Sequence, residues 1–295
     1  MKSIIVLSGK GGVGKSSIAA SLAVVMSRNS KIVCADCDVD ASNLSLLFGL
    51  TTDKYVEWRP LSTNQEAVVD KEKCTGCGRC TEFCYFNALE LEDGKPRLKK
   101  FGCEGCGVCE LVCPEKAIKL VNIENAYVGY ARSREGFFIA SAQLQPGNSG
   151  SGKVVFEVKK KAMQIGMDAD LMLIDAAAGI GCPVIASVAG ADYAVLVIEP
   201  TPSGYADMLR ALEIVDHFKI KKGIIINKHD LNKRFSEKIE SFAKEKNINV
   251  LAKIPFDKNF VTAMTCMIPI IEYDKEYEPV FEGIRQKLMA SLARG

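Results

Sequence analysis

The segment Gly9-Lys10-Gly11-Gly12-Val13-Gly14-Lys15-Ser16 follows a short apolar run at residues 2–7 and precedes small and apolar residues of helical spacing at 15–27. It fits the pattern GxxxxGK[ST], and a preceding strand and a following helix are the context that this pattern requires. The glycines let the backbone wrap around a phosphate, and the helix N-terminus adds positive potential. The segment predicts a phosphate-binding loop in which Lys15 neutralises the β and γ phosphates and Ser16 holds Mg²⁺.

Short apolar runs alternate with helical patterns over most of the chain, which is typical of βαβ units and a parallel sheet buried on both faces. Strands are expected at residues 2–7, 31–35, 137–140, 171–174, 193–198, 223–226 and 250–254, and helices at 15–27, 153–167, 203–218 and 235–245. We predict an α/β P-loop domain with a mostly parallel sheet flanked by helices, formed by residues 1–58 and 123–295. A small α+β domain is expected as an insert at residues 59–122.

The expected insert contains two cysteine runs of one spacing, Cys74-x2-Cys77-x2-Cys80-x3-Cys84 and Cys103-x2-Cys106-x2-Cys109-x3-Cys113-Pro114. This is the bacterial ferredoxin spacing, in which the fourth cysteine of each run serves the other cluster. Tyr85 replaces the usual proline after the first run but removes no ligand. Zinc on paired CxxC motifs is the alternative. The prediction is a first 4Fe-4S cluster on Cys74, Cys77, Cys80 and Cys113, and a second on Cys103, Cys106, Cys109 and Cys84.

The loop sequence KGGVGKS has a second lysine, Lys10, and resembles the deviant Walker A motif of the MinD/ParA/Mrp family of P-loop ATPases, which includes the nitrogenase iron protein. With its insert, the chain is similar to MinD-family ATPases that contain a ferredoxin domain. The resemblance implies ATP or ADP with Mg²⁺ and a nucleotide-dependent homodimer, in which Lys10 reaches the partner's phosphates. It also implies these nucleotide contacts: Gly9, Lys10, Gly11, Gly12, Val13, Gly14, Lys15, Ser16, Ser17 and Asn227.

Aspartates complete the expected nucleotide site. Asp175 ends an apolar run and looks like a Walker B aspartate, so Ser16, Asp38 and Asp175 form the expected Mg²⁺ site. By resemblance, Asp38 positions or deprotonates the attacking water, which makes Lys10, Lys15 and Asp38 the expected catalytic residues. Asp36 and Asp40 are interpreted as solvated or capping residues.

The nucleobase is left open by the residues themselves. Asn227 is expected to contact adenine, by resemblance, but residues 227–230 also satisfy the NKxD pattern of GTPases. ATP is preferred on the resemblance, and GTP is the alternative.

Four further cysteines lie outside the two runs. Cys34 and Cys37 are three apart on an expected strand, so they point to opposite faces and are predicted to be core or loop residues. Cys266 is expected to be a small buried hydrophobe. Cys182 has the offset of a cluster-binding cysteine in the nitrogenase iron protein, but residues 121–174 hold no second cysteine, so a structural or redox-reactive thiol is favoured over a shared dimer cluster.

Bulk properties restrict the remaining choices. The net charge of +2 argues against a nucleic-acid partner, and no apolar run reaches the roughly 18 residues of a membrane span. Twelve cysteines without a secretion signal indicate thiolate ligands in a cytoplasmic protein. The favoured function is an ATPase whose nucleotide cycle controls electron transfer to an unidentified redox partner. The alternatives are an iron-sulfur carrier serving an apo-protein and, behind it, a positioning ATPase.

Overall fold

The computed structural model describes residues 1–148 and 150–293. Its main feature is a nine-stranded sheet in the order β13-β12-β11-β1-β10-β2-β9-β8-β3. Seven of these strands run parallel, and β8 and β3 are added antiparallel at one edge. The strands are β1 Lys2–Ser8, β2 Ile32–Cys37, β3 Glu57–Leu61, β8 Ala126–Arg132, β9 Phe138–Leu144, β10 Leu171–Ala178, β11 Tyr193–Ile198, β12 Lys221–Asn227 and β13 Asn249–Ile254. The predicted mostly parallel α/β fold is confirmed.

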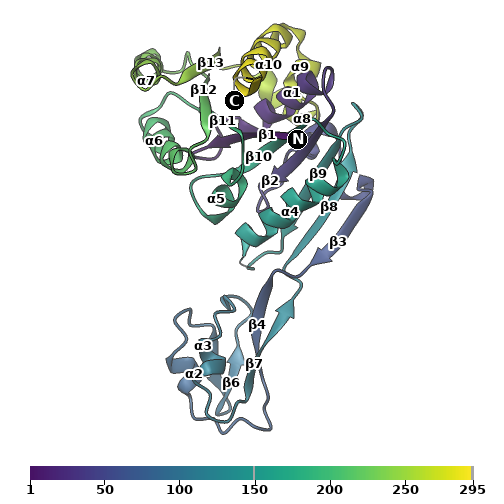
Figure 1. Cartoon of the computed structure of the whole chain (residues 1–295). Coiled ribbons are helices and arrows are strands. Elements are labelled where there is room, and N and C mark those ends of the chain that lie inside the picture. Colours follow the sequence, from purple (N-terminus) through teal and green to yellow (C-terminus); the bar gives the residue numbers. More distant parts are fainter. Residues whose placement is uncertain (149, 294–295) are drawn as a thin grey trace.

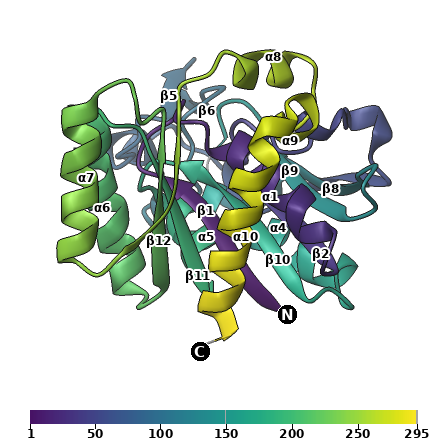
Figure 2. The same ribbon diagram turned by 90° about the horizontal axis from the view of Figure 1, so that it is seen from above.

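Helices cover both faces of this sheet (Figures 1 and 2). One face packs against α1, α8, α9 and α10, and the other against α4, α5, α6 and α7. Their bounds are α1 Lys15–Ser27, α4 Ser151–Ile165, α5 Cys182–Val188, α6 Pro202–His217, α7 Lys233–Glu245, α8 Asn259–Thr265, α9 Ile270–Tyr273 and α10 Glu278–Ala293. Cys34 and Cys37 are both fully buried in the cores of opposite faces, as their spacing predicts.

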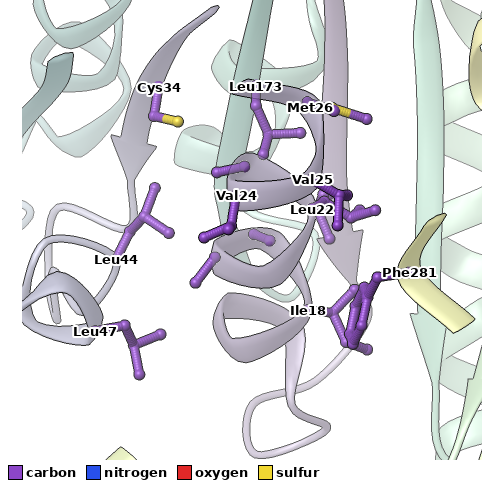
Figure 3. Packing of buried hydrophobic residues seen from close by; sticks show 14 of the residues in the cluster. Ile18, Leu22, Val24, Val25, Met26, Cys34, Leu44, Leu47, Leu173 and Phe281 are labelled. Atoms are coloured by element: carbon purple, nitrogen blue, oxygen red, sulfur yellow. The ribbon is translucent and has the colours of Figure 1, made fainter. Parts of the chain in front are cut away.

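The last helix, α10, packs inward. Phe281, Ile284 and Leu288 are completely buried, and Figure 3 shows the Phe281 ring beside Ile18 of α1. The apolar stripe of α10 is therefore part of the core, as is usual for a terminal amphipathic helix. Among the described residues, none of the helices combines the length and the apolar character needed to cross a bilayer.

Residues 64–123 lie outside the large sheet. They contain two small antiparallel sheets, one of β4 (Asn64–Val69) with β7 (Ile118–Ile123) and one of β5 (Leu89–Glu92) with β6 (Lys95–Leu98), and two short helices, α2 (Arg79–Glu82) and α3 (Val108–Leu111). This cysteine-rich unit has its own small core, which includes Ala67, Cys80, Leu89, Cys109 and Ile118. Figure 1 shows the unit projecting from the sheet on the β4–β7 ribbon.

The chain leaves the large sheet later than the sequence suggests. Glu57–Leu61 pairs with β8, so the boundary that we expected between residues 58 and 59 falls inside strand β3. Pro60 and the charged residues of this strand hide its pattern, and an edge strand tolerates both because one of its sides is unpaired.

Candidate functional site

The loop between β1 and α1 has the backbone of an anion cradle. Gly12 and Gly14 have φ angles of 78° and 89°, which side chains disfavour. A β-carbon on Gly14 would also lie 2.5 Å from the Asn227 amide nitrogen, so only glycine fits. Helix α1 begins directly after this loop, without a capping side chain or an acid in its first turn. Its first N–H groups are therefore available to an anion.

Lys15 and Asp175 form a buried ion pair at the base of the loop. The Lys15 side chain is 6% exposed and its Nζ lies 2.5 Å from Oδ1 of Asp175. Burial by itself lowers the pKa of Lys15, but the charges of Asp175, Asp38 and Asp36 outweigh it and hold the pKa above its ordinary value. The second carboxylate oxygen of Asp175, Oδ2, is buried and has no hydrogen-bond partner among residues 1–148 and 150–293. A buried acceptor of this kind fits a site for Mg²⁺.

Asp36 belongs to this charge cluster, which corrects our interpretation of it as a solvated or capping residue. It is completely buried and pairs in register with Asp175 on the neighbouring parallel strand. Its Oδ2 accepts hydrogen bonds from the Ser42 hydroxyl (2.6 Å) and the Leu44 N–H (2.9 Å). Burial, reinforced by the charge of Asp175, raises the pKa of Asp36 to about 7. Asp36 therefore shapes the loop that carries Asp38, whose own pKa is raised by burial.

The raised pKa of Asp36 predicts a pH-dependent stability. A carboxyl with a folded-state pKa of about 7 and an ordinary value of 3.8 binds more protons when folded, so its contribution to the free energy of unfolding falls as pH rises from about 4 to 7. Asp36→Asn should remove this decline, which is of the order of 2–4 kcal/mol. Urea unfolding of both proteins at pH 5 and pH 8, without nucleotide or Mg²⁺, measures the difference. If the free energy of unfolding changes equally between pH 5 and pH 8 in both proteins, the prediction is contradicted.

A large cavity opens beside the loop. Its empty space, counted with the open mouth, is about 1400 Å³. The residues expected at the nucleotide site that line it are Gly11, Gly12, Gly14, Lys15, Ser16, Ser17, Asp38 and Asn227. Much of the remaining lining was not foreseen and is apolar: Leu46, Leu47, Pro255, Phe256, Phe260, Val261, Met264 and Met267. Apolar lining in the same cavity as a phosphate cradle suits a nucleoside, whose base is the less polar end.

Lys10, Gly9 and Val13 line a different and smaller cavity against α6. The Lys10 ammonium lies 3.4 Å from Glu199 Oε1 and 3.3 Å from the Ser203 hydroxyl. The other oxygen of Glu199 accepts from Lys228 Nζ (2.9 Å), which also donates to the Gly12 carbonyl (3.1 Å). Burial by itself raises the pKa of Glu199, but the hydrogen bonds and charges of Lys228 and Lys10 outweigh it, so the pKa is lowered. Lys10 is thus held within its own chain and outside the large cavity.

Asn227 supports the loop directly. Its side-chain amide donates to the carbonyl of Val13 (2.7 Å) and its oxygen accepts from the Lys228 N–H (3.0 Å). Asp230, the last residue of the NKxD pattern, does not line the large cavity, and its carboxylate accepts the N–H of Phe256 (2.6 Å). Asn227 therefore lines the cavity, whereas the carboxylate that would recognise guanine does not.

The eight cysteines of the two runs surround two cavities. Cys74, Cys77, Cys80 and Cys113 line one of about 330 Å³, and Cys84, Cys103, Cys106 and Cys109 line another of about 350 Å³, both counted with their openings. The fourth sulfur of each run accepts a backbone N–H, from Ala88 to Cys84 (3.3 Å) and from Ala117 to Cys113 (3.2 Å). The fourth cysteine of each run thus lines the cavity that is formed by the first three cysteines of the other run.

The cysteine side chains of residues 1–148 and 150–293 are all free thiols. Within these residues, no group of three or more His, Cys, Asp or Glu side chains is arranged to hold a metal ion. Cys182 is exposed at the start of α5, beside Gly152 of α4. Cys266 is exposed as well, which corrects our expectation of a buried residue: it ends the short surface helix α8.

Together the cradle, the buried Lys15–Asp175 pair and the parallel sheet define a P-loop nucleotide-binding protein. The family described as CobQ/CobB/MinD/ParA nucleotide binding domain matches residues 4–270, and the chain belongs to this family.

Relatives agree with this assignment. An uncharacterized protein of Methanocaldococcus jannaschii is 38% identical over 291 residues, which cover 97% of this chain and 95% of the relative. The septum site-determining protein MinD of Helicobacter pylori is 24% identical, with 97% of this chain and 90% of that protein covered. The structure of MinD complexed with Mg-ADP from Pyrococcus horikoshii has a TM-score of 0.59 at 18% identity, covering 97% and 95% of the two chains. The predicted family is confirmed, and this last likeness supports the fold alone.

Proposed function

We propose that the chain is a Mg²⁺-dependent ATPase whose nucleotide cycle controls electron transfer through two 4Fe-4S clusters. The observation that carries this proposal is the pair of cysteine-lined cavities on a unit attached to a nucleotide-binding fold. In this proposal residues 64–123 are a ferredoxin-like domain and the rest of the described chain is the ATPase domain. The proposal includes a cytoplasmic protein without a nucleic-acid partner, as the net charge of +2 favours.

The two sets of four thiols fit cubane clusters. Each iron of such a cluster takes one protein thiolate, so four sulfurs stand apart around a cavity instead of converging on one atom. The backbone N–H groups on Cys84 and Cys113 are of the kind that tunes cluster potential. One cluster would be held by Cys74, Cys77, Cys80 and Cys113 and the other by Cys84, Cys103, Cys106 and Cys109. When bound, they would accept and donate single electrons.

Hydrolysis in this proposal is performed by the cradle. The loop N–H groups and Lys15 bind the phosphates, and Asp38 orients the attacking water, since phosphoryl transfer needs mainly positioning and charge neutralisation. Ser16, Asp38 and Asp175 would hold Mg²⁺, which would offset the phosphate charge; the unpartnered Oδ2 of Asp175 supports this role. Lys10 would act on the phosphates of a second copy in a nucleotide-dependent homodimer.

ATP is favoured over GTP as the substrate. Guanine selection by an NKxD pattern needs the carboxylate at the nucleobase, and Asp230 is not among the residues that line the large cavity. We expect ATP to compete out a bound fluorescent ATP analogue at much lower concentration than GTP. The reverse order would reassign the base.

An iron-sulfur carrier is the second candidate. Cys77 and Cys106 are exposed, one at each cavity, which favours access by an acceptor protein. Against it, each cavity has a full set of four thiols and no ligand position left for transfer. We keep electron transfer ahead on this ground. The third candidate, a positioning ATPase, has less support because the apolar stripe of α10 is buried.

The deciding experiment measures the reduction potentials of anaerobically purified protein without nucleotide, with ADP and with a non-hydrolysable ATP analogue. We expect the potentials to differ between these states. Potentials indifferent to nucleotide, together with release of iron and sulfide to an apo-protein, would favour the carrier instead.

A further inference from the structure

The segment of residues 144–148, called the 144–148 loop, begins at the last residue of strand β9 and lies between the nucleotide site and the cysteine-rich unit. On one side β9 pairs with β2 in parallel, with Asp36 opposite Ser141. The Leu144 N–H donates to the carbonyl of Val39 (2.8 Å), the residue after Asp38. The buried hydroxyls of Ser45 and Ser141 are 2.9 Å apart. The segment 38–45, which carries Asp38, is therefore attached to β9 near both of its ends.

On its other side this loop contacts the cysteine-rich unit. Phe101, two residues before Cys103, packs its ring directly on Gly147, and a β-carbon there would overlap the ring. Gly147 has a φ angle of 79°, so the position excludes a side chain for two reasons. Cys103 lines the cavity that it shares with Cys84, Cys106 and Cys109, called here the second cysteine cavity. Because Phe101 is two residues from Cys103, its contact with Gly147 connects the loop to that cavity.

The base of the β4–β7 ribbon is fastened to the same loop. The Gln145 N–H donates to the carbonyl of Asn125 (2.9 Å), and the side-chain oxygen of Asn125 accepts the Thr63 N–H (2.8 Å). A polar cleft of about 690 Å³, counted with its opening, separates Lys153 of α4 from Glu104 and Gly105. The second cysteine cavity therefore lies on the side of the unit that faces the ATPase fold. The cleft leaves open space between α4 and the cysteine-rich unit.

We propose that the 144–148 loop transmits the nucleotide state of the Asp38 segment to the second cysteine cavity through the contact of Phe101 with Gly147. The inference rests on the proposed function, in which nucleotide orders the Asp38 segment, as γ-phosphate and its Mg²⁺ do in related switches. Movement of residues 38–45 pulls on Leu144 through its backbone hydrogen bond to Val39, and Gly147 passes the displacement to the Phe101 ring. The segment 99–106, with Cys103 and Cys106, shifts with it.

Hydrogen exchange of the full chain, as isolated anaerobically, tests this without relying on redox activity. In the wild-type protein a Mg²⁺-loaded ATP analogue should change exchange rates about fivefold or more in both 38–45 and 99–106, the range of ordinary allosteric coupling. In Phe101→Ala the response of 99–106 should vanish, while that of 38–45 and the basal ATP turnover persist. Gly147→Ala should uncouple the segments in the same way. Phe156→Ala, on a phenylalanine of α4 that is also exposed, should leave both responses intact.

The outcomes separate two failures. If 38–45 responds to nucleotide in the wild type but 99–106 does not, or if Phe101→Ala keeps the response of 99–106, the coupling is overturned and the proposed ATPase stands. If neither segment responds in the wild type, the nucleotide cycle itself fails, and the coupling fails with it.

Discussion

Lys15→Met should abolish nucleotide turnover, with a loss on the order of 10³-fold or more, because phosphoryl transfer depends on charges placed at the phosphates. It should also destabilise the fold. Removal of one partner of a buried ion pair costs roughly 3–5 kcal/mol, and here it leaves Asp175 beside the equally buried Asp36. Phosphate release at saturating Mg-ATP and urea unfolding measure the two effects.

Two further variants separate loss of chemistry from loss of fold. Lys15→Met combined with Asp175→Asn removes both charges of the pair, so it should regain most of the stability without regaining turnover. Lys233→Met removes an exposed lysine of α7 and should change neither quantity. Unchanged turnover in Lys15→Met would refute the assignment of the phosphate site.

Much of the fold could be predicted because its signals are local. Buried parallel strands are continuous apolar runs, so β11 was predicted with its exact bounds and β1 to within one residue. Strands β3 and β8 were not foreseen. Each pairs antiparallel at the sheet edge and owes its place to partners distant in sequence, which no short window contains.

The candidate site divides in the same way. The loop of residues 9–16 is contiguous and could be identified from its pattern. Glu199 forms ion pairs with Lys10, 189 residues away in the sequence, and with Lys228, 29 residues away. These residues meet only because strand β11 lies between β1 and β12 in the sheet. The burial of Asp36 likewise depends on the register of its strand with β10, so the sequence around it predicted the wrong environment for its side chain.

The two cysteine cavities predict which four thiols hold each cluster, and the iron content of cysteine variants tests this grouping. The local alternative would group Cys84 with its own run at residues 74–80. In the structure Cys84 lines the cavity of Cys103, Cys106 and Cys109 instead. Crossed grouping ties the two runs to each other, so loss of one thiol should affect a cavity formed mostly by the other run.

Paired replacements distinguish these groupings by iron and acid-labile sulfide per chain, which should be about eight of each in the intact protein. Under crossed grouping, Cys84→Ser with Cys103→Ser takes two ligands from one cavity and leaves about four irons, whereas Cys84→Ser with Cys74→Ser takes one ligand from each cavity and leaves about eight. Under local grouping the two results exchange. Pairs are needed because a cluster can survive with one ligand missing. Cys182→Ser and Cys266→Ser lie outside both cavities and should retain all the iron. Zinc in place of iron and sulfide in the intact chain would rule out clusters in either grouping, because a tetrahedral zinc site needs four sulfurs around a single ion and no sulfide.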